Sequence, residues 1–368
     1  MSLLPFDAFL KNVSSKPYQI TKAGYLEEGK YPVVDQGQKF ITGYSNNDEK
    51  VFKNDESVII FGDHTRLIKY VDFDFVIGAD GTKVLIPVDD SIDTKYAYYH
   101  LLSTKIENLG YSRHYKLLKE KTFVKPSMEK QQEIVKALDK AKELIGLRQE
   151  ALDKLDELAQ SVFIDMFGDP ILNPNNLVIK KLDDVSQKIT DGEHGTVART
   201  ETGRMYLMAR NISKLGELDL TELSFISEES HNKIFKRCNA EYNDLLLVCV
   251  GATIGKCTLV PDMKDFSLAR SVALIKPIKT EMNSKYLLYF FKTEFMRRQI
   301  EKSSNASAQA GLYTGAIKKM KIMIPSLNLQ KKFASIIEKL EVQKSYYKVE
   351  LDKLQENFDA LLAQNFEG

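Results

Sequence analysis

Short polar loops between apolar runs hold most of the side chains that could do chemistry in this chain. Residues 61–66 (FGDHTR) and 110–116 (GYSRHYK) bring together histidine, arginine and hydroxyl groups. Comparable loops in the second half are residues 250–256 (VGATIGK) and 311–319 (GLYTGAIKK). Lysine and arginine can neutralise phosphates, and arginine, asparagine and glutamine can fork to base edges, with serine and threonine assisting. These residue types favour nucleic-acid contact; a solvated surface is the plainer alternative.

The candidate contact residues follow from loop position and side-chain type. In the first half of the chain they are His64, Thr65, Arg66, Lys83, Ser112, Arg113, His114 and Tyr115. In the second half they are Arg210, Asn211, Thr253, Lys256, Arg270, Tyr313 and Thr314. Four further lysines are expected either to contact phosphates or to be solvated, namely Lys116, Lys119, Lys318 and Lys319.

Sequence patterns for catalysis or metal binding fail in this chain. Residues 250–257 resemble a phosphate-binding loop, but Val250 stands where the Walker pattern needs glycine and Cys257 where it needs serine or threonine. The five histidines are scattered, and the three cysteines have neither CxxC spacing nor a histidine pair nearby. We therefore expect recognition without catalysis, with no catalytic residue, no metal site and no cofactor on this chain.

Composition places these loops on a globular background. The 368 residues are enough for two or more domains, 43% of them are hydrophobic, and the formal net charge is only +1. Positive charge is local instead, because residues 111–125 hold five Lys/Arg and one acid, and residues 311–325 hold three lysines and no acid. Neither a signal peptide nor an apolar run of about 18 residues is evident, which predicts a cytoplasmic protein without a membrane span.

Each basic loop leads into the same short passage. Pro126-Ser127 recurs as Pro325-Ser326, 199 residues later. Proline disfavours helix in the residue before it, and serine is a good helix N-cap. Both passages therefore predict the start of a helix, and Gly168 predicts where the first of the two helices ends.

The two predicted helices share one apolar register. Steps of four and three residues give, in the first helix, Ile134, Leu138, Ala141, Ile145, Arg148, Leu152, Leu155, Ala159, Val162 and Met166. The positions 199 residues later are Phe333, Ile337, Leu340, Lys344, Tyr347, Leu351, Leu354, Phe358, Leu361 and Asn365. A run of more than about four heptads is typical of a coiled-coil seam. The chain is therefore interpreted as an internal duplication, in which the charged Arg148 and Lys344 either set the register, meet a partner or snorkel at the seam edge.

The segments before the helices are rich in β-type runs. Strands are expected at residues 31–36, 57–64, 67–71, 75–78 and 82–87, and again at 205–209, 244–251, 257–262 and 272–277, with helices at 96–103 and 284–301. The predicted fold class is α+β, with two mixed α/β, β-rich domains joined by two long antiparallel coiled-coil helices. The predicted divisions are residues 1–125, 126–168, 169–324 and 325–368, related by an internal pseudo-twofold repeat.

This organisation resembles the DNA specificity subunit of type I restriction-modification systems. The resemblance covers essentially the whole chain. It is carried by FGDHTR with FVIGADGTKVLIP and GYSRHYK, by VGATIGK with SLARSVALIKP, and by the two Pro-Ser-x3-Gln passages. It implies two target recognition domains (residues 1–125 and 169–324) that each read one half of a split DNA site, and spacer helices that dock two methyltransferase subunits. S-adenosylmethionine, ATP and Mg²⁺ are then expected on the methyltransferase and restriction–translocase partners.

The leading hypothesis is a non-catalytic subunit that directs adenine methylation and restriction by its partners. A rigid helix of about 40 residues is about 60 Å long, which exceeds one and a half turns of B-DNA. Two alternatives stay open: the specificity subunit of a type IIB/IIG-like methyltransferase-nuclease, and a coiled-coil scaffold whose β-rich domains bind proteins. Neighbouring genes for an adenine methyltransferase and a helicase-nuclease would favour the first hypothesis.

Overall fold

The computed structural model describes residues 2–14, 16–53, 56–110, 112–213, 216–305 and 311–366. The chain forms two compact units: unit 1 contains residues 1–151 and 347–368, and unit 2 contains residues 152–346. Each unit therefore combines one β-rich segment with part of each long helix.

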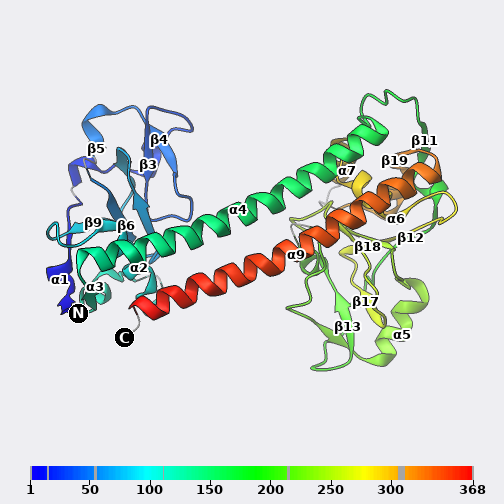
Figure 1. Ribbon diagram of the computed structural model, residues 1–368. Coiled ribbons are helices and arrows are strands. Elements are labelled where there is room, and N and C mark those ends of the chain that lie inside the picture. Colours follow the sequence, from blue (N-terminus) through cyan, green and yellow to red (C-terminus); the bar gives the residue numbers. More distant parts are fainter. Residues whose placement is uncertain are drawn as a thin grey trace. The chain divides into compact units, whose positions relative to one another are not determined.

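Unit 1 is built on two small sheets that pack face to face (Figure 1). Its strands are β2 (Leu10–Asn12), β3 (Tyr31–Val34), β4 (Gly43–Ser45), β5 (Val51–Phe52), β6 (Val58–Gly62), β7 (Ile68–Val71), β8 (Phe75–Ile77) and β9 (Thr82–Pro87). One sheet is antiparallel with the order β2-β9-β6-β7, and the other has the order β4-β3-β8-β5 with β3 and β8 parallel. Successive strand residues point to opposite faces, so Ile60 packs between the sheets and Ile59 packs toward the helices.

Helices cover the outer face of the β2-β9-β6-β7 sheet. They are α1 (Phe6–Phe9), α2 (Thr94–Ser103) and α3 (Tyr115–Lys119), accompanied by the short antiparallel pair β1 (Ser2–Pro5) and β10 (Thr122–Lys125). Asp93 caps α2, because its carboxylate accepts hydrogen bonds from the backbone N–H groups of Lys95 and Tyr96 at 2.9 and 2.8 Å. The Tyr96 ring is fully buried in the same core as Phe123 of β10.

Unit 2 repeats this arrangement. Its strands are β11 (Val178–Lys181), β12 (Ser186–Asp191), β13 (Arg204–Leu207), β14 (Phe225–Ile226), β15 (Leu245–Val248), β16 (Cys257–Leu259), β17 (Phe266–Leu268), β18 (Val272–Pro277) and β19 (Lys321–Ile324). The sheets have the orders β12-β18-β15-β16 and β14-β13-β17, with β13 and β17 parallel, and β11 pairs with β19. Leu246 packs between these sheets, whereas Leu245 and Leu247 face the helices.

The helices of unit 2 are partly shared with unit 1: α6 (Ser284–Phe291) and α8 (Thr314–Lys319) correspond to α2 and α3. The other two, α5 (Glu228–Arg237) and α7 (Glu294–Asn305), distinguish unit 2. α5 has Ser227 as its N-cap and packs on β17, at the place where β5 pairs with β8 in unit 1. α7 follows α6 directly.

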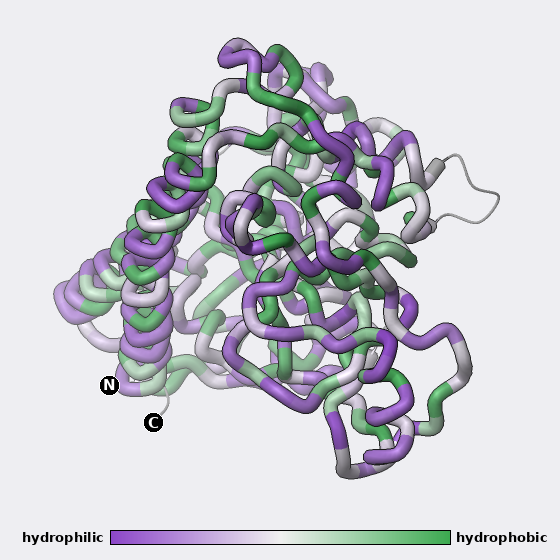
Figure 2. The backbone as a smooth tube through the Cα atoms, turned by 90° about the vertical axis from the view of Figure 1, so that its right-hand side faces the viewer, coloured by the Kyte–Doolittle hydropathy of each residue, from purple (hydrophilic) through white to green (hydrophobic). Residues whose placement is uncertain are grey.

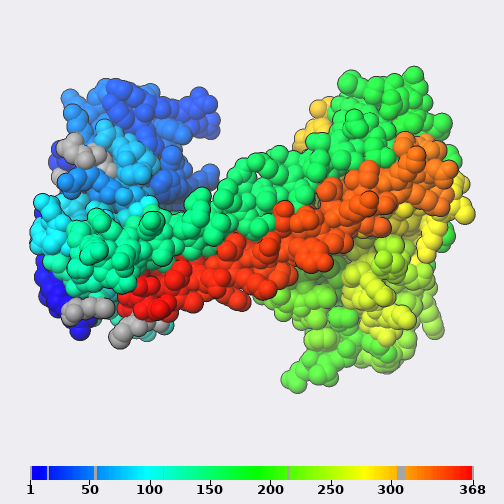
Figure 3. Space-filling view, viewed as in Figure 1, coloured from blue at the N-terminus to red at the C-terminus, as the bar shows by residue number. Residues whose placement is uncertain are grey.

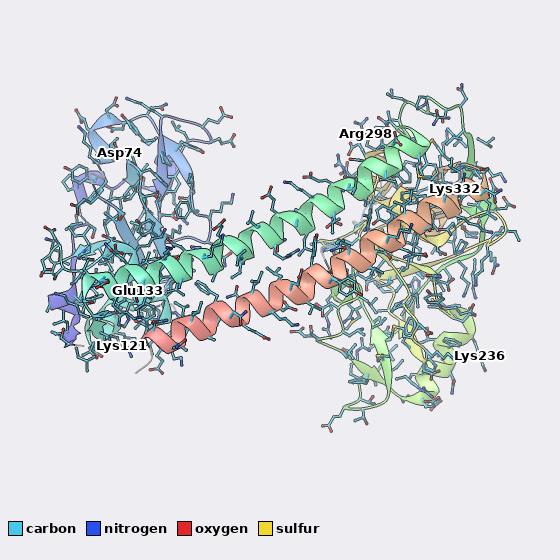
Figure 4. The ribbon with its side chains drawn as sticks, viewed as in Figure 1. Asp74, Lys121, Glu133, Lys236, Arg298 and Lys332 are labelled. Carbon is cyan, nitrogen blue, oxygen red and sulfur yellow. The ribbon has the colours of Figure 1, made fainter. Side chains whose placement is uncertain are left out.

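The long helices are α4 (Met128–Phe167) and α9 (Leu327–Phe366), each of 40 residues. In both, the seam positions predicted from the sequence are buried or half-buried. Charged residues such as Glu133 and Lys332 occupy the exposed faces (Figure 4), and hydrophilic and hydrophobic residues alternate along both helices (Figure 2). The burial therefore follows the apolar stripe.

Within each unit the two helices run antiparallel and their surfaces touch (Figure 3). In unit 1 the first part of α4 and the end of α9 share one core, through Ile134 and Phe366. In unit 2 the end of α4 and the start of α9 share another, through Phe167 and Phe333. The beginning of one helix therefore meets the end of the other.

Charged seam residues make specific contacts between the helices. In unit 1 the Arg148 guanidinium lies 4.1 Å from the centre of the Tyr347 ring, and its Nη2 lies 3.2 Å from Oε2 of Glu350. In unit 2 Nζ of Lys344 lies 2.6 Å from Oδ1 of Asp156. Both pairs favour one alignment of the helices, which agrees with the predicted register role of Arg148 and Lys344.

A buried glutamine joins each long helix to its β-rich segment. Gln131 accepts a hydrogen bond from the backbone N–H of Asp93 at 2.8 Å, and its amide donates to the carbonyls of Ser91 and Pro126 at 2.9 and 3.1 Å. Gln330 repeats this pattern in unit 2, accepting from Asn283 N–H at 2.8 Å and donating to the carbonyls of Glu281 and Pro325 at 3.0 and 2.9 Å. The joint fixes the cap of α2 or α6 against the start of α4 or α9.

The structure confirms the predicted α+β class and the predicted strands, with ends that shift by up to three residues. Ser127 and Ser326 accept N-terminal N–H bonds of their helices at 3.4 Å, in agreement with the predicted caps. The helix predicted at 284–301 is two helices, because Thr293 interrupts it: its hydroxyl donates to Phe290 O at 2.7 Å and accepts from Met296 N–H at 3.4 Å.

Candidate nucleic-acid interface

The predicted contact residues of unit 1 lie on three loops joined by hydrogen bonds. We call these loops, residues 62–67, 79–83 and 112–115, loop cluster 1. The cluster contains all eight candidates from the first half of the chain. Largely buried strands flank the first two loops, β6 and β7 around residues 62–67 and β8 and β9 around residues 79–83. The third loop leads into α3, whose Leu118 is buried, so these elements fix the loop ends.

Asp63 lies at the centre of loop cluster 1. Its backbone N–H donates to Gly81 O at 2.8 Å, and its carbonyl accepts from His114 N–H at 2.7 Å. One carboxylate oxygen accepts from Tyr115 N–H at 2.8 Å, and the other lies 3.9 Å from Nζ of Lys83. Because Asp63 is buried, these contacts hold all three loops through one residue.

Gln36, which follows β3, supports the same loops from outside the cluster. Its Oε1 accepts from His64 N–H at 3.0 Å, and its Nε2 donates to Asp80 O at 2.6 Å. Its backbone carbonyl accepts from the Thr65 hydroxyl at 2.7 Å. Gly81 has φ +88°, and a Cβ there would come within 2.6 Å of Gln36 Nε2, so glycine is required. No sequence pattern marks Gln36, since a single glutamine after a strand is not distinctive.

Unit 2 has a corresponding set, loop cluster 2, formed by residues 249–256, 269–272 and 311–314. It contains Thr253, Lys256, Arg270, Tyr313 and Thr314.

Cys249 occupies the central position of loop cluster 2. Its N–H donates to Ser271 O at 2.9 Å, and its carbonyl accepts from Leu312 N–H at 2.8 Å, as for Asp63 in unit 1. Its thiol donates to Arg270 O at 3.2 Å. Burial raises the pKa of Cys249 to about 12, so the thiol keeps its proton at neutral pH.

The turn of the first loop is also equivalent in the two clusters. Arg66 N–H donates to Gly62 O at 2.7 Å, and Gly255 N–H donates to Val248 O at 2.9 Å. Both residues have positive φ, 61° for Arg66 and 94° for Gly255. The left-handed region costs a non-glycine residue about 1 kcal/mol. Unit 1 therefore has an arginine where unit 2 has the less strained glycine. The Arg66 guanidinium donates a hydrogen bond to Ile106 O at 3.1 Å.

Accessibility separates the predicted residues into three groups. The exposed residues are Thr65, Arg113, Arg210, Arg270 and Tyr313. The half-buried residues are His64, Arg66, Lys83, Ser112, Tyr115, Thr253, Lys256 and Thr314. His114 and Asn211 are buried. Arg210 lies outside loop cluster 2 but next to it, because the backbone N–H of Ala209 donates to the Ser271 hydroxyl at 3.1 Å.

Two of the predicted contact residues, His114 and Asn211, are buried and bonded within the protein, which for His114 is the hydrogen bonding to a neighbouring loop that was the alternative to DNA contact. Nδ1 of His114 is 3.0 Å from Asp63 O, and its Nε2 accepts from Leu109 N–H at 3.1 Å. The Asn211 side chain accepts from Met208 N–H and donates to two backbone carbonyls, at distances of 3.0 to 3.2 Å. Both side chains therefore lie beneath the surface in this structure, where they support the loops.

Two of the predicted phosphate-contacting lysines form matching ion pairs. Lys119 Nζ lies 3.1 Å from Asp7, and Lys318 Nζ lies 3.3 Å from Asp183, a duplicated contact on the surface. Lys116 is exposed beside the first pair. Solvent screens such exposed pairs, so they contribute little to stability.

A further loop, residues 191–199, borders loop cluster 2. Arg270 N–H donates to Glu193 O at 3.0 Å, which places this loop beside a predicted contact residue. His194 is exposed, with Nε2 2.7 Å from Asp191, and the Arg199 guanidinium is partnered by a tyrosine ring at 4.2 Å. The sequence DGEHGTVAR is polar and contains glycine, like the other candidate loops. The same reasoning could therefore have added His194 and Arg199 to the candidate contact residues.

Electrostatics within the clusters favour neutral aromatic and thiol groups beside the cations. Burial raises the pKa of Tyr115 to about 12, so it is neutral, and Lys83 Nζ lies 5.5 Å from the centre of its ring.

Across the residues that the structure describes, no group of three or more His, Cys, Asp and Glu side chains could hold a metal ion. In the same described ranges, none of the helices combines the length and apolarity needed to cross a bilayer.

Comparison with known families now assigns the chain. The model of the family described as "Type I restriction modification DNA specificity domain" matches residues 10–157 and, separately, residues 174–353. The chain belongs to this family of type I restriction-modification DNA specificity proteins and carries its domain twice.

Individual relatives agree with this assignment. The type I restriction enzyme EcoR124I/EcoR124II specificity subunit of Escherichia coli is 33% identical over 100 residues, and the match spans 27% of this chain and 25% of that protein. The type I restriction-modification S subunit of M. genitalium has a TM-score of 0.59 at 18% identity, covering 98% of this chain and 94% of that one. A structure titled as the basis of complex assembly and conformational transition of the type I system has a TM-score of 0.56 at 15% identity, covering 99% and 97%. At these identities the structural likeness establishes the fold.

Proposed function

We propose that this chain is a non-catalytic subunit that reads a split DNA site, with loop cluster 1 reading one half and loop cluster 2 the other. The observation that supports this most is the structural equivalence of Asp63 and Cys249: each makes the same backbone hydrogen bonds within its own unit, and these bonds hold two sets of loops whose exposed side chains differ. A duplicated support with different surface chemistry suits one reader of two different half-sites.

The exposed arginines are the strongest candidates for base contacts. Arg113 in loop cluster 1 and Arg270 in loop cluster 2 are exposed on loops whose backbones are fixed by hydrogen bonds. Arginine can bind guanine with two hydrogen bonds. Thr65 and Tyr313 are exposed beside them. The half-buried Lys83 and Lys256 suit phosphate contact, because their charges lie beside the same loops.

The long helices are proposed to act as the spacer between the half-sites. Support comes from the contacts of Arg148 and Lys344 across the helix pair and from the glutamine joints, which fix each reader to its helix. A repeated chain offers two similar places for one kind of partner. We propose that two methyltransferase subunits occupy them and that restriction–translocase subunits join through that complex.

Methylation of adenine and DNA cleavage are then partner activities. S-adenosylmethionine, ATP and Mg²⁺ would bind on those partners, and this chain would supply the choice of sequence. The type IIB/IIG-like alternative keeps the same reading role and differs in placing methylation and cleavage on one partner chain.

Methylome sequencing of cells that carry this chain with its partner methyltransferase tests the proposal. The expected motif has two specified parts separated by unspecified positions of fixed number, and it disappears when this gene is deleted. A single continuous motif, or a motif that persists without this chain, would overturn the proposal.

A further inference from the structure

We propose that Asp63 is a positioning residue that decides how unit 1 presents Arg113, and that Cys249 does the same for Arg270 in unit 2. This inference rests on the proposed reading function and concerns Asp63 and Cys249, which are buried behind the loops that carry the exposed arginines.

Asp63 and Cys249 share their backbone hydrogen bonds. Each N–H donates to the loop that precedes β9 or β18, and each carbonyl accepts from the loop that precedes α3 or α8. Since these bonds are the same in both units, they hold the loops together but do not explain a difference between them.

The side chains are the part that differs. The Asp63 carboxylate accepts from Tyr115 N–H at 2.8 Å, two residues beyond Arg113. The Cys249 thiol donates to the carbonyl of Arg270 itself at 3.2 Å. In each unit the central side chain thus bonds to the loop that carries the exposed arginine, although the two arginines lie on different loops.

The chemistry of each bond explains the residue type. Tyr115 N–H needs an acceptor, and a carboxylate can only accept, while its second oxygen faces Lys83 at 3.9 Å. Arg270 O needs a donor, and a protonated thiol supplies one. A thiol in place of Asp63 would offer Tyr115 N–H only a weak acceptor, and a carboxylate in place of Cys249 could not donate to Arg270 O, so the central residue and the arginine-bearing loop form one matched pair.

The test measures half-site discrimination with the chain assembled with its methyltransferase partner. Asp63→Ala, Asp63→Asn and Cys249→Ala are compared on DNA with the full site and on DNA with one base pair changed in either half. Asp63→Ala is expected to lower discrimination about tenfold in the half-site of unit 1 alone, the scale of one two-bond arginine–guanine contact. Cys249→Ala is expected to do so in the other half.

Asp63→Asn is the conservative control, because its amide oxygen can still accept from Tyr115 N–H. It is expected to keep most discrimination, and Cys249→Ala carries the test if Asp63→Ala does not fold. Equal loss in both halves, or unchanged discrimination in folded Asp63→Ala, would overturn the inference, since a merely structural role lowers stability and rate on every DNA alike. If the unaltered complex shows no split-site discrimination, the proposed function itself fails.

Discussion

Replacing Gln131 by methionine should show how strongly the glutamine joint holds the β-rich segment of unit 1 to α4. Methionine keeps a similar volume but removes the amide. The backbone N–H of Asp93 and the carbonyls of Ser91 and Pro126 then lose a partner at 2.8, 2.9 and 3.1 Å. An unmade buried hydrogen bond costs about 1–3 kcal/mol, and carbonyls tolerate the loss better than N–H groups.

The expected loss for Gln131→Met is therefore about 2–4 kcal/mol in the free energy of unfolding of unit 1. Gln330→Met should cost unit 2 the same within about 1 kcal/mol, because its three bonds match in kind and length. Gln132→Met is the matched control: Gln132 is the exposed neighbour, and its change should stay within about 0.5 kcal/mol.

Urea unfolding followed by circular dichroism measures the total loss, and hydrogen exchange assigns it. Peptides from α2 and the start of α4 should lose protection in Gln131→Met, and those from α6 and the start of α9 in Gln330→Met. A loss below about 1 kcal/mol for both variants would refute the reasoning that these bonds are buried and unreplaced. A large effect at only one glutamine would refute the equivalence of the two joints.

Three further predictions concern strain, pH and spacing. Arg66→Gly relieves the backbone strain at φ 61° but removes the guanidinium bond to Ile106 O, so the free energy of unfolding should stay within about 1 kcal/mol of the unaltered chain while discrimination falls in the half-site of unit 1; a loss above about 2 kcal/mol would count against strain at this turn. Burial lowers the pKa of His100 to about 4 from an unfolded value of about 6.5, so unit 1 should lose stability as the pH falls from about 6.5 toward 4. His100→Phe, which introduces the residue type of the corresponding Phe290, should flatten that slope in urea titrations at several pH values, and an unchanged slope would mean that another group titrates. Deleting one heptad from each long helix should change the permitted gap between half-sites in methylome data while the specified bases stay the same; an unchanged gap would mean that the helices are not the spacer.

The duplication was predictable because it rests on local signals. The Pro-Ser caps and the four-three apolar spacing depend on backbone preferences and burial, and both can be recognised in one contiguous stretch of sequence. The recurrence of Gln131 as Gln330 was equally visible, but its purpose was not, because its partners lie up to 49 residues away in the chain. Long-range pairing of this kind has no local pattern.

Loop residues were harder to predict for a related reason. Arg113 and His114 are adjacent in sequence, yet the first is exposed and the second is fully buried against Asp63. Residue type identifies groups that are able to bind DNA, whereas loop conformation decides which of them reach the surface. Asn211 illustrates the same limit, since its amide is used to close its own loop.

The most direct test of the central claim compares Arg113→Ala with Arg270→Ala in methylome sequencing, each expressed with the partner methyltransferase. The account predicts that Arg113→Ala relaxes base preference in one part of the motif and that Arg270→Ala relaxes it in the other part, with the gap unchanged in both. Equal relaxation of both parts by either variant would contradict the claim that each unit reads its own half-site.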